Sequence, residues 1–146
     1  IKPRSSTVMV GVQAFVAQGL GLVSLFGFHN QLHQVFLVAA AWLICFSAAR
    51  HFLTCFDDEA NRSLSHIWGL FAAEMALILG HWQIAYFGFL PQLALVLSVV
   101  GYALGVGYYI HKVHGLRAGV RRQLIIFCII LLALILLQPD WQAKTF

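Results

Sequence analysis

The chain has 146 residues, of which 61% are hydrophobic and only 10% are charged. Together with a mean hydropathy of +0.85, this composition excludes an ordinary soluble domain, in which about 25% of residues are charged. The net charge is +4 with histidine neutral, but the basic residues are spread among short connections, so no nucleic-acid partner is expected. The sequence therefore predicts a single-domain integral membrane protein whose first partner is the lipid bilayer.

The first apolar segment, residues 7–28, is long enough to cross a bilayer and follows a short basic lead. A signal peptide would have a shorter apolar region ending at a small-residue cleavage site, so we predict a retained transmembrane helix. Gln18 lies near the middle of this helix. Helical periodicity places it on a face of small residues, which suits close packing against another helix. That face consists of Gly11, Ala14, Gln18 and Gly21.

Four further apolar segments extend the prediction to an all-α polytopic bundle of five transmembrane helices. The predicted spans cover residues 35–54, 64–86, 92–110 and 123–138. The third span carries polar residues along its length and is predicted to lie at the centre of the bundle. The fourth contains Gly101 and Gly105 at the spacing of a helix-packing face. The fifth is almost purely aliphatic, which favours a peripheral helix that faces lipid.

Lysine and arginine predict the orientation of these spans. With a cytoplasmic N-terminus, eight of the nine basic residues lie inside and only Lys144 lies outside, as the positive-inside rule requires. The eight are Lys2, Arg4, Arg50, Arg62, Lys112, Arg117, Arg121 and Arg122. We therefore expect a cytoplasmic N-terminus, an external C-terminus and a location in a cytoplasmic (inner) membrane.

Glu74 lies in the middle of the third span, where a carboxylate costs a few kcal/mol unless it faces protein or water. At about 100° per residue, His66 and His81 project from the same side as Glu74. This pattern predicts that the carboxyl points into the bundle, with Gln18 at similar depth as its hydrogen-bond partner. Such a centre would bind a proton or a solute and couple the charge to solute movement.

Four of the seven histidines fall at two predicted depths. His51 and His66 lie toward the inner side, whereas His33 and His81 lie toward the outer side. Each pair could ligate one b-type haem, because such a haem takes two imidazoles and the segment between His66 and His81 extends about 22 Å. A histidine-ligated chlorophyll would need one imidazole. Haem or another tetrapyrrole is therefore the candidate cofactor, and the alternative ligands are His29 and His111.

The remaining sequence patterns give little support for a metal site or for an enzyme. Two histidine pairs have helical chelation spacing, at residues 29 and 33 and at residues 111 and 114, but the predicted topology separates them, so no metal site is expected. The three cysteines form no CxxC pair, and neither a Ser–His–Asp order nor a Gly-rich phosphate loop is present. The acidic run at residues 57–59 is interpreted as a solvated loop.

Three functions remain open from the sequence. The first is a small transport or solute-binding protein with a protonatable Glu74 at its centre. The second is a haem- or pigment-binding electron-transfer subunit that uses the histidine pairs. The third is a non-catalytic accessory subunit of a larger membrane complex. The Gly101 and Gly105 surface favours association with copies of the chain or with other membrane subunits.

Overall fold

The computed structural model describes residues 4–56, 58–80, 86–87, 90–114 and 118–137, and within these ranges the chain is almost entirely helical. The helices are α1 (Arg4–Gly27), α2 (Gln34–Leu53), α3 (Asn61–Gly80), α4 (Gln92–His114) and α5 (Ala118–Leu137). A short 3-10 helix, η1 (His29–Gln31), lies between α1 and α2, and two short strands, β1 (Tyr86–Phe87) and β2 (Leu90–Pro91), precede α4. The predicted all-helical class is confirmed.

The predicted C-terminal end of the third helix is wrong. α3 ends at Gly80 rather than continuing to Tyr86, which instead lies in β1 and pairs antiparallel with β2. Glycine at a helix end is a common stop signal because it tolerates the backbone conformations that terminate a helix. Pro91 lacks a backbone N–H and therefore suits the position directly before α4. Residues 81–85 lie outside the described residues.

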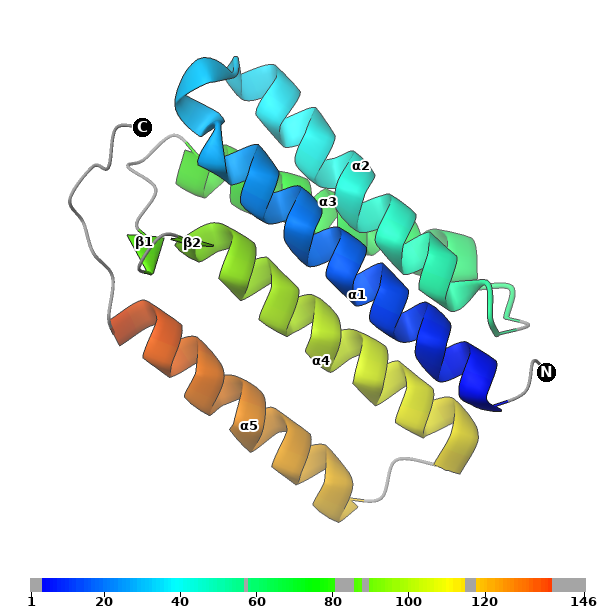
Figure 1. The fold of residues 1–146 in the computed structure, drawn as a ribbon. Helices are drawn as coiled ribbons and strands as arrows, with labels where there is room; N and C mark the ends of the chain where they lie inside the picture. Colours follow the sequence, from blue (N-terminus) through cyan, green and yellow to red (C-terminus); the bar gives the residue numbers. More distant parts are fainter. Residues whose placement is uncertain (1–3, 57, 81–85, 88–89, 115–117, 138–146) are drawn as a thin grey trace.

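Helices α1 to α4 form a bundle, and α5 lies along its side (Figure 1). α2 packs against both α1 and α3, and α1 also packs against α4. α3 contacts α4 over a shorter length, and α5 packs mainly against α4, which agrees with the predicted peripheral position of the fifth helix. The predicted central position of the third helix is wrong, because α3 packs chiefly against α2 and leaves one face exposed.

Small side chains explain the close packing of α2 and α3. Ala41 and Cys45 of α2, with Ala72 and Ala76 of α3, are completely buried. Their size lets the two backbones approach closely, as is common between helices in membranes. The same core includes larger side chains from all four helices, namely Leu22, Phe26, Leu37, Trp68, Leu93 and Leu97.

Polar side chains at the start of two helices bond to carbonyls of their neighbours. Gln34 at the start of α2 donates from Nε2 to the Leu77 carbonyl of α3 at 3.3 Å. Gln92 at the start of α4 donates to the Ile135 carbonyl of α5 at 2.9 Å. Carbonyls in the last turn of a helix have no intrahelical partner, so these bonds satisfy groups that would otherwise need water.

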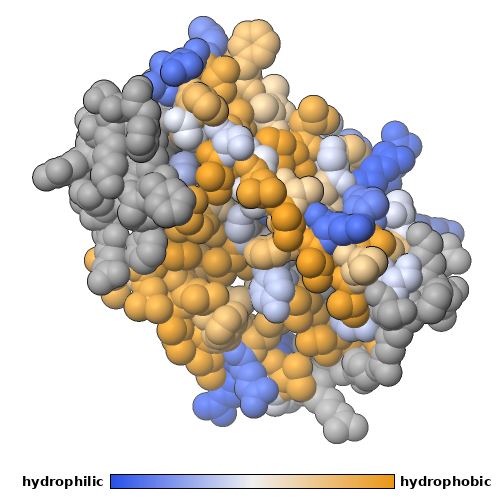
Figure 2. All heavy atoms as spheres, in the orientation of Figure 1, coloured by the Kyte–Doolittle hydropathy of each residue, from blue (hydrophilic) through white to orange (hydrophobic). Residues whose placement is uncertain are grey.

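Four of the helices are long and apolar enough to cross a membrane, over residues 6–27, 34–53, 92–113 and 119–137. α3 is not among them, because Arg62, His66 and Glu74 lower its mean hydropathy. Large apolar side chains cover much of the outer surface of the bundle, and Figure 2 shows them over the middle of one face. Length, composition and surface are those of a multi-pass membrane protein.

Candidate functional site

A cavity of about 750 Å³ lies among α1, α2, α3 and α4. Its lining comes from the first half of α1, the end of α2, the first half of α3 and the second half of α4, so it occupies the half of the bundle that contains the start of α1. Most of the lining side chains are aliphatic or aromatic. The polar exceptions carry hydroxyl, amide or indole groups, and they are Thr7, Gln18, Trp68, Tyr102, Tyr108 and Tyr109.

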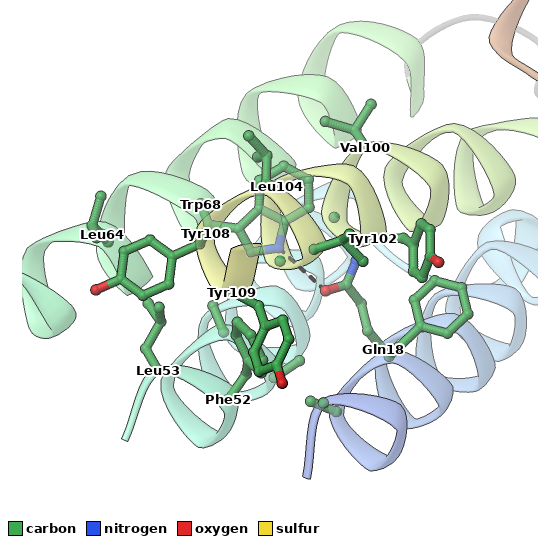
Figure 3. A pocket seen from close by; sticks show the side chains of 18 of the residues that line it. Gln18, Phe52, Leu53, Leu64, Trp68, Val100, Tyr102, Leu104, Tyr108 and Tyr109 are labelled. Atoms are coloured by element: carbon green, nitrogen blue, oxygen red, sulfur yellow. Dashed lines mark hydrogen bonds between the residues drawn. The ribbon is translucent and has the colours of Figure 1, made fainter. Parts of the chain in front are cut away.

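Gln18 is the polar centre of this cavity. It is 5% exposed, its Nε2 donates to the Leu97 carbonyl of α4 at 3.2 Å, and its Oε1 accepts a bond from Trp68 Nε1 of α3 at 3.2 Å. Figure 3 shows the Gln18 and Trp68 side chains meeting at the wall of the cavity. One amide therefore links three helices and satisfies the indole N–H, which a buried tryptophan requires.

Gly101 makes this contact sterically feasible. A Cβ atom at Gly101 would lie 2.6 Å from Gln18 Nε2 and 3.0 Å from a Trp68 ring carbon, so both side chains would have to move. A Cβ atom at Gly105, one turn further along α4, would instead make an ordinary van der Waals contact, 3.8 Å from a Phe52 ring carbon. Of the predicted glycine pair, Gly101 thus lies in a tight three-helix contact and Gly105 lines the cavity.

The predicted pairing of Gln18 with Glu74 is absent from the described residues, and the predicted burial of Glu74 is wrong. Glu74 is exposed in the isolated chain, whereas Ala72 and Ala76, two positions away on either side, are completely buried. Two residues correspond to about 200° around a helix, so Glu74 lies on the opposite face of α3. The reason is the edge position of α3, which buries only the side that packs against its neighbours.

A polar cluster closes the end of the bundle beside the cavity. Lys112 Nζ of α4 forms an ion pair with Asp58 Oδ2 at 2.6 Å, and the Tyr108 hydroxyl donates to the same oxygen at 2.8 Å. These bonds, first that from Lys112, then those from Tyr108 and the Ala60 N–H, lower the pKa of Asp58 to about 2. The acidic connection predicted to be a solvated loop is therefore tied through Asp58 to α4, and residue 57 lies outside the described residues.

The histidines occupy separate environments in the described part of the chain. His33 caps α2, with its Nδ1 accepting from the Val35 N–H at 3.4 Å. The His66 ring packs on Phe46 and Trp42 of α2 with centroids 4.6 and 5.9 Å apart, and His51 is exposed. His81 lies outside the described residues. Within the residues described, no group of three histidine, cysteine or acidic side chains could hold a metal ion.

The cavity and the Asp58–Lys112 ion pair were not predicted from the sequence. A glutamine at mid-depth among small residues was the one available signal, and it identified Gln18 but not its partners. Comparison with models of protein families, with curated proteins and with solved structures finds no match for this chain. The geometry of the cavity is therefore the basis for assigning a function to this chain.

Proposed function

We propose that all five helices span the cytoplasmic membrane, with the N-terminus in the cytoplasm and the C-terminus outside. Five antiparallel helices place the start of α1, the α2–α3 connection and the α4–α5 connection at one end of the bundle (Figure 1). All the lysine and arginine residues among the described ranges belong to this end, and they are Arg4, Arg50, Arg62, Lys112, Arg121 and Arg122. This asymmetry supports a cytoplasmic location for that end.

Within that arrangement we propose a small transport or solute-binding protein that takes an apolar or amphiphilic molecule. The observation that carries the proposal is the cavity itself, about 750 Å³ in volume and lined by side chains without formal charge. Binding sites for small organic molecules typically have volumes of about 300–1,000 Å³, apolar walls and a few convergent polar groups. A charged solute would lose its hydration against these walls without a counter-charge, so a neutral binding portion is favoured.

The lining also suggests how such a molecule would be oriented. Tyr108 is in the cavity wall and also in the polar cluster with Asp58 and Lys112, so a polar head would lie at this end. The apolar portion would extend toward Gln18. The Gln18 amide has two N–H donors and a carbonyl oxygen with two acceptor sites, so after its bonds to Leu97 and Trp68 it retains capacity for one weakly polar group of the solute.

Filling the cavity tests the proposal. Gly105→Leu adds a side chain to the cavity lining beside Phe52, whereas Gly119→Leu is a matched control on α5 with nothing within 4 Å of its Cβ position. The ligand probe is a brominated fatty acid, which quenches Trp68 fluorescence when it enters the cavity, in a chain whose other tryptophans are replaced by phenylalanine.

We expect saturable quenching in the parent chain and in Gly119→Leu, and an affinity at least about tenfold lower, or about 1.4 kcal/mol, in Gly105→Leu. Equal quenching in the two leucine variants would show that the probe reaches Trp68 from the surrounding lipid rather than from the cavity. The proposal does not use Glu74, whose position on the outer face of α3 removes it from this cavity.

A further inference from the structure

The cavity is closed by hydrogen bonds at both of its ends along the bundle. Toward the middle of the bundle, Gln18 of α1 and Trp68 of α3 are joined by the bond between Oε1 and Nε1 at 3.2 Å. At the basic end, the Tyr108 hydroxyl and Lys112 Nζ both bond to Asp58 Oδ2. A molecule that entered along the bundle axis from either end would have to break these bonds.

Three of the side walls are also closed among the described residues. Between α1 and α4, the rings of Phe15 and Tyr102 line the cavity and meet edge to face with centroids 5.3 Å apart. Between α1 and α2, the Cβ position of Gly11 lies 3.2 Å from the Phe52 ring. α2 and α3 pack closely through small buried side chains. The wall between α3 and α4 is the remaining one.

The wall between α3 and α4 is open in the described part of the chain. These two helices contact each other over a short length. Leu64, Ile67 and Phe71 of α3 line the cavity and are 37%, 62% and 39% exposed. On the facing helix, Leu104 lines the cavity and is 57% exposed, and Figure 3 shows Leu64 and Leu104 among the lining side chains. The cavity therefore opens sideways between α3 and α4, through a rim of apolar side chains.

This opening lies at the depth of one leaflet. Leu64 and Phe71 are three and ten residues after the start of α3, or about 4.5 and 15 Å along the helix axis. Half of a hydrocarbon core about 30 Å thick is about 15 Å. In the proposed orientation, the opening therefore faces the acyl chains of the cytoplasmic leaflet.

We infer that the ligand of the cavity is a lipid of the cytoplasmic leaflet, whose acyl chain enters between α3 and α4. This inference rests on the proposed solute site and names the class and source of its ligand. An acyl chain that moves from the bilayer into an apolar cavity stays in apolar surroundings, so it enters without the loss of hydration that a solute from water would incur. Water itself fits poorly, because a buried water needs about three polar partners and the lining is mostly aliphatic or aromatic.

The polar cluster sets the orientation of the lipid. Tyr108 lines the cavity, and with Asp58 and Lys112 it forms the polar end that lies beside the opening. The head group stays at this level, outside the apolar walls, because burying it among them would cost its hydration. The acyl chain extends from there toward Gln18.

Fluorescence quenching in lipid vesicles tests the route and the ligand together. The vesicles consist of phosphatidylcholine with brominated acyl chains, and Trp68 is the reporter because it lines the cavity and is only 8% exposed. The other tryptophans are replaced by phenylalanine and the three native cysteines by alanine. Single cysteines are then labelled with N-cyclohexylmaleimide, at Ile67→Cys in the rim or at Leu70→Cys one turn further along α3. Leu70 is a matched control, because it is 55% exposed but does not belong to the described cavity lining.

We expect strong quenching of Trp68 in the unlabelled chain and in labelled Leu70→Cys, and severalfold weaker quenching in labelled Ile67→Cys, where the label obstructs the opening. Both labels are attached to exposed positions after folding, so a difference between them does not reflect a failure to fold. Equal quenching in the two labelled proteins overturns the inference. Weaker quenching with a label at Val12→Cys on α1, but not at Ile67→Cys, would place the opening between α1 and α4 and also overturns it.

The free brominated fatty acid separates this inference from the proposed solute site. If Gly105→Leu weakens fatty-acid binding but brominated phosphatidylcholine does not quench Trp68, the solute site stands and the lipid ligand is refuted. If Gly105→Leu has no effect on fatty-acid binding, the solute site itself is refuted.

Discussion

Gln18 and Glu74 lie at similar depth in the bundle but in opposite environments. Gln18 is fourteen residues after the start of α1 and Glu74 is thirteen residues after the start of α3, at the same end of the molecule. The amide of Gln18 is buried and bonded to α3 and α4, whereas the carboxyl of Glu74 is on an exposed face. Depth along a helix therefore does not determine whether a polar group belongs to the interior, because the facing direction depends on how the helices pack.

Replacing Gly101 by a larger residue should disturb the contacts of Gln18 most strongly. Gly101→Leu forces atoms into the space that Gln18 and Trp68 occupy, so we expect it to lower the free energy of unfolding by about 3 kcal/mol, at the upper end of overpacking effects. Thermal unfolding in detergent, followed by a thiol-reactive dye that labels the buried Cys45 and Cys55, measures the change. Gly105→Leu is the control, and an equal loss in both variants would show that the Gly101 contact is not specific.

Removing the amide itself should have the next largest effect. Gln18→Leu leaves the Trp68 N–H without an acceptor in an apolar cavity, and an unsatisfied buried donor costs about 1–3 kcal/mol. The double variant with Trp68→Phe removes the stranded donor, so part of the loss should be recovered relative to the sum of the single changes. Strictly additive losses in the same thermal assay would mean that the two side chains do not interact.

A smaller effect is expected at the polar cluster outside the apolar segments. Because the pKa of Asp58 is lowered to about 2 from an ordinary value of 3.8, its contribution to stability is complete above about pH 4 and is lost as the pH falls from 4 to 2. Circular dichroism of thermal unfolding across this range should show a decline that is reduced in Asp58→Asn. A parallel decline in both proteins would assign the acid sensitivity to other groups.

The smallest effect on folding is expected at Glu74. In detergent, Glu74→Gln should change the free energy of unfolding of the monomer by no more than about 0.5 kcal/mol, because it alters an exposed side chain without described partners. The same thermal assay measures it beside Gln18→Leu. A loss as large as that of Gln18→Leu would show that Glu74 belongs to the interior and that the comparison between the two residues is wrong.

Much of the helical architecture could be predicted, because long apolar segments separated by short polar connections specify helices almost independently of tertiary contacts. The small-residue face predicted on the first helix does pack closely against a neighbour. The Cβ positions of Gly11 and Gly21 lie 3.2 and 3.1 Å from Phe52 and Ile44 of α2. The buried face of the third helix was harder to predict. Its hydrophobic residues surround it on nearly all sides, so periodicity could not distinguish the buried alanines from the exposed face that contains Glu74.

The candidate site was predictable only through Gln18. Its partners come from residues 50 and 79 positions away along the chain, and no local pattern encodes contacts at that separation. The cavity is lined in part by Gly11 and Gly105, which lack side chains, and it lies between α3 and α4, which make few contacts with each other. Empty space between helices follows from their relative tilt, which the sequence pattern does not specify.

We propose that the cavity lined by Gln18 holds an apolar or amphiphilic molecule. Native mass spectrometry of the protein, released from detergent after gentle extraction from its membrane, tests this claim most directly. We expect a bound molecule of defined mass on the parent chain and on Gly119→Leu, and its absence from Gly105→Leu. Parent protein without any bound molecule, or the same mass retained by Gly105→Leu, would contradict it.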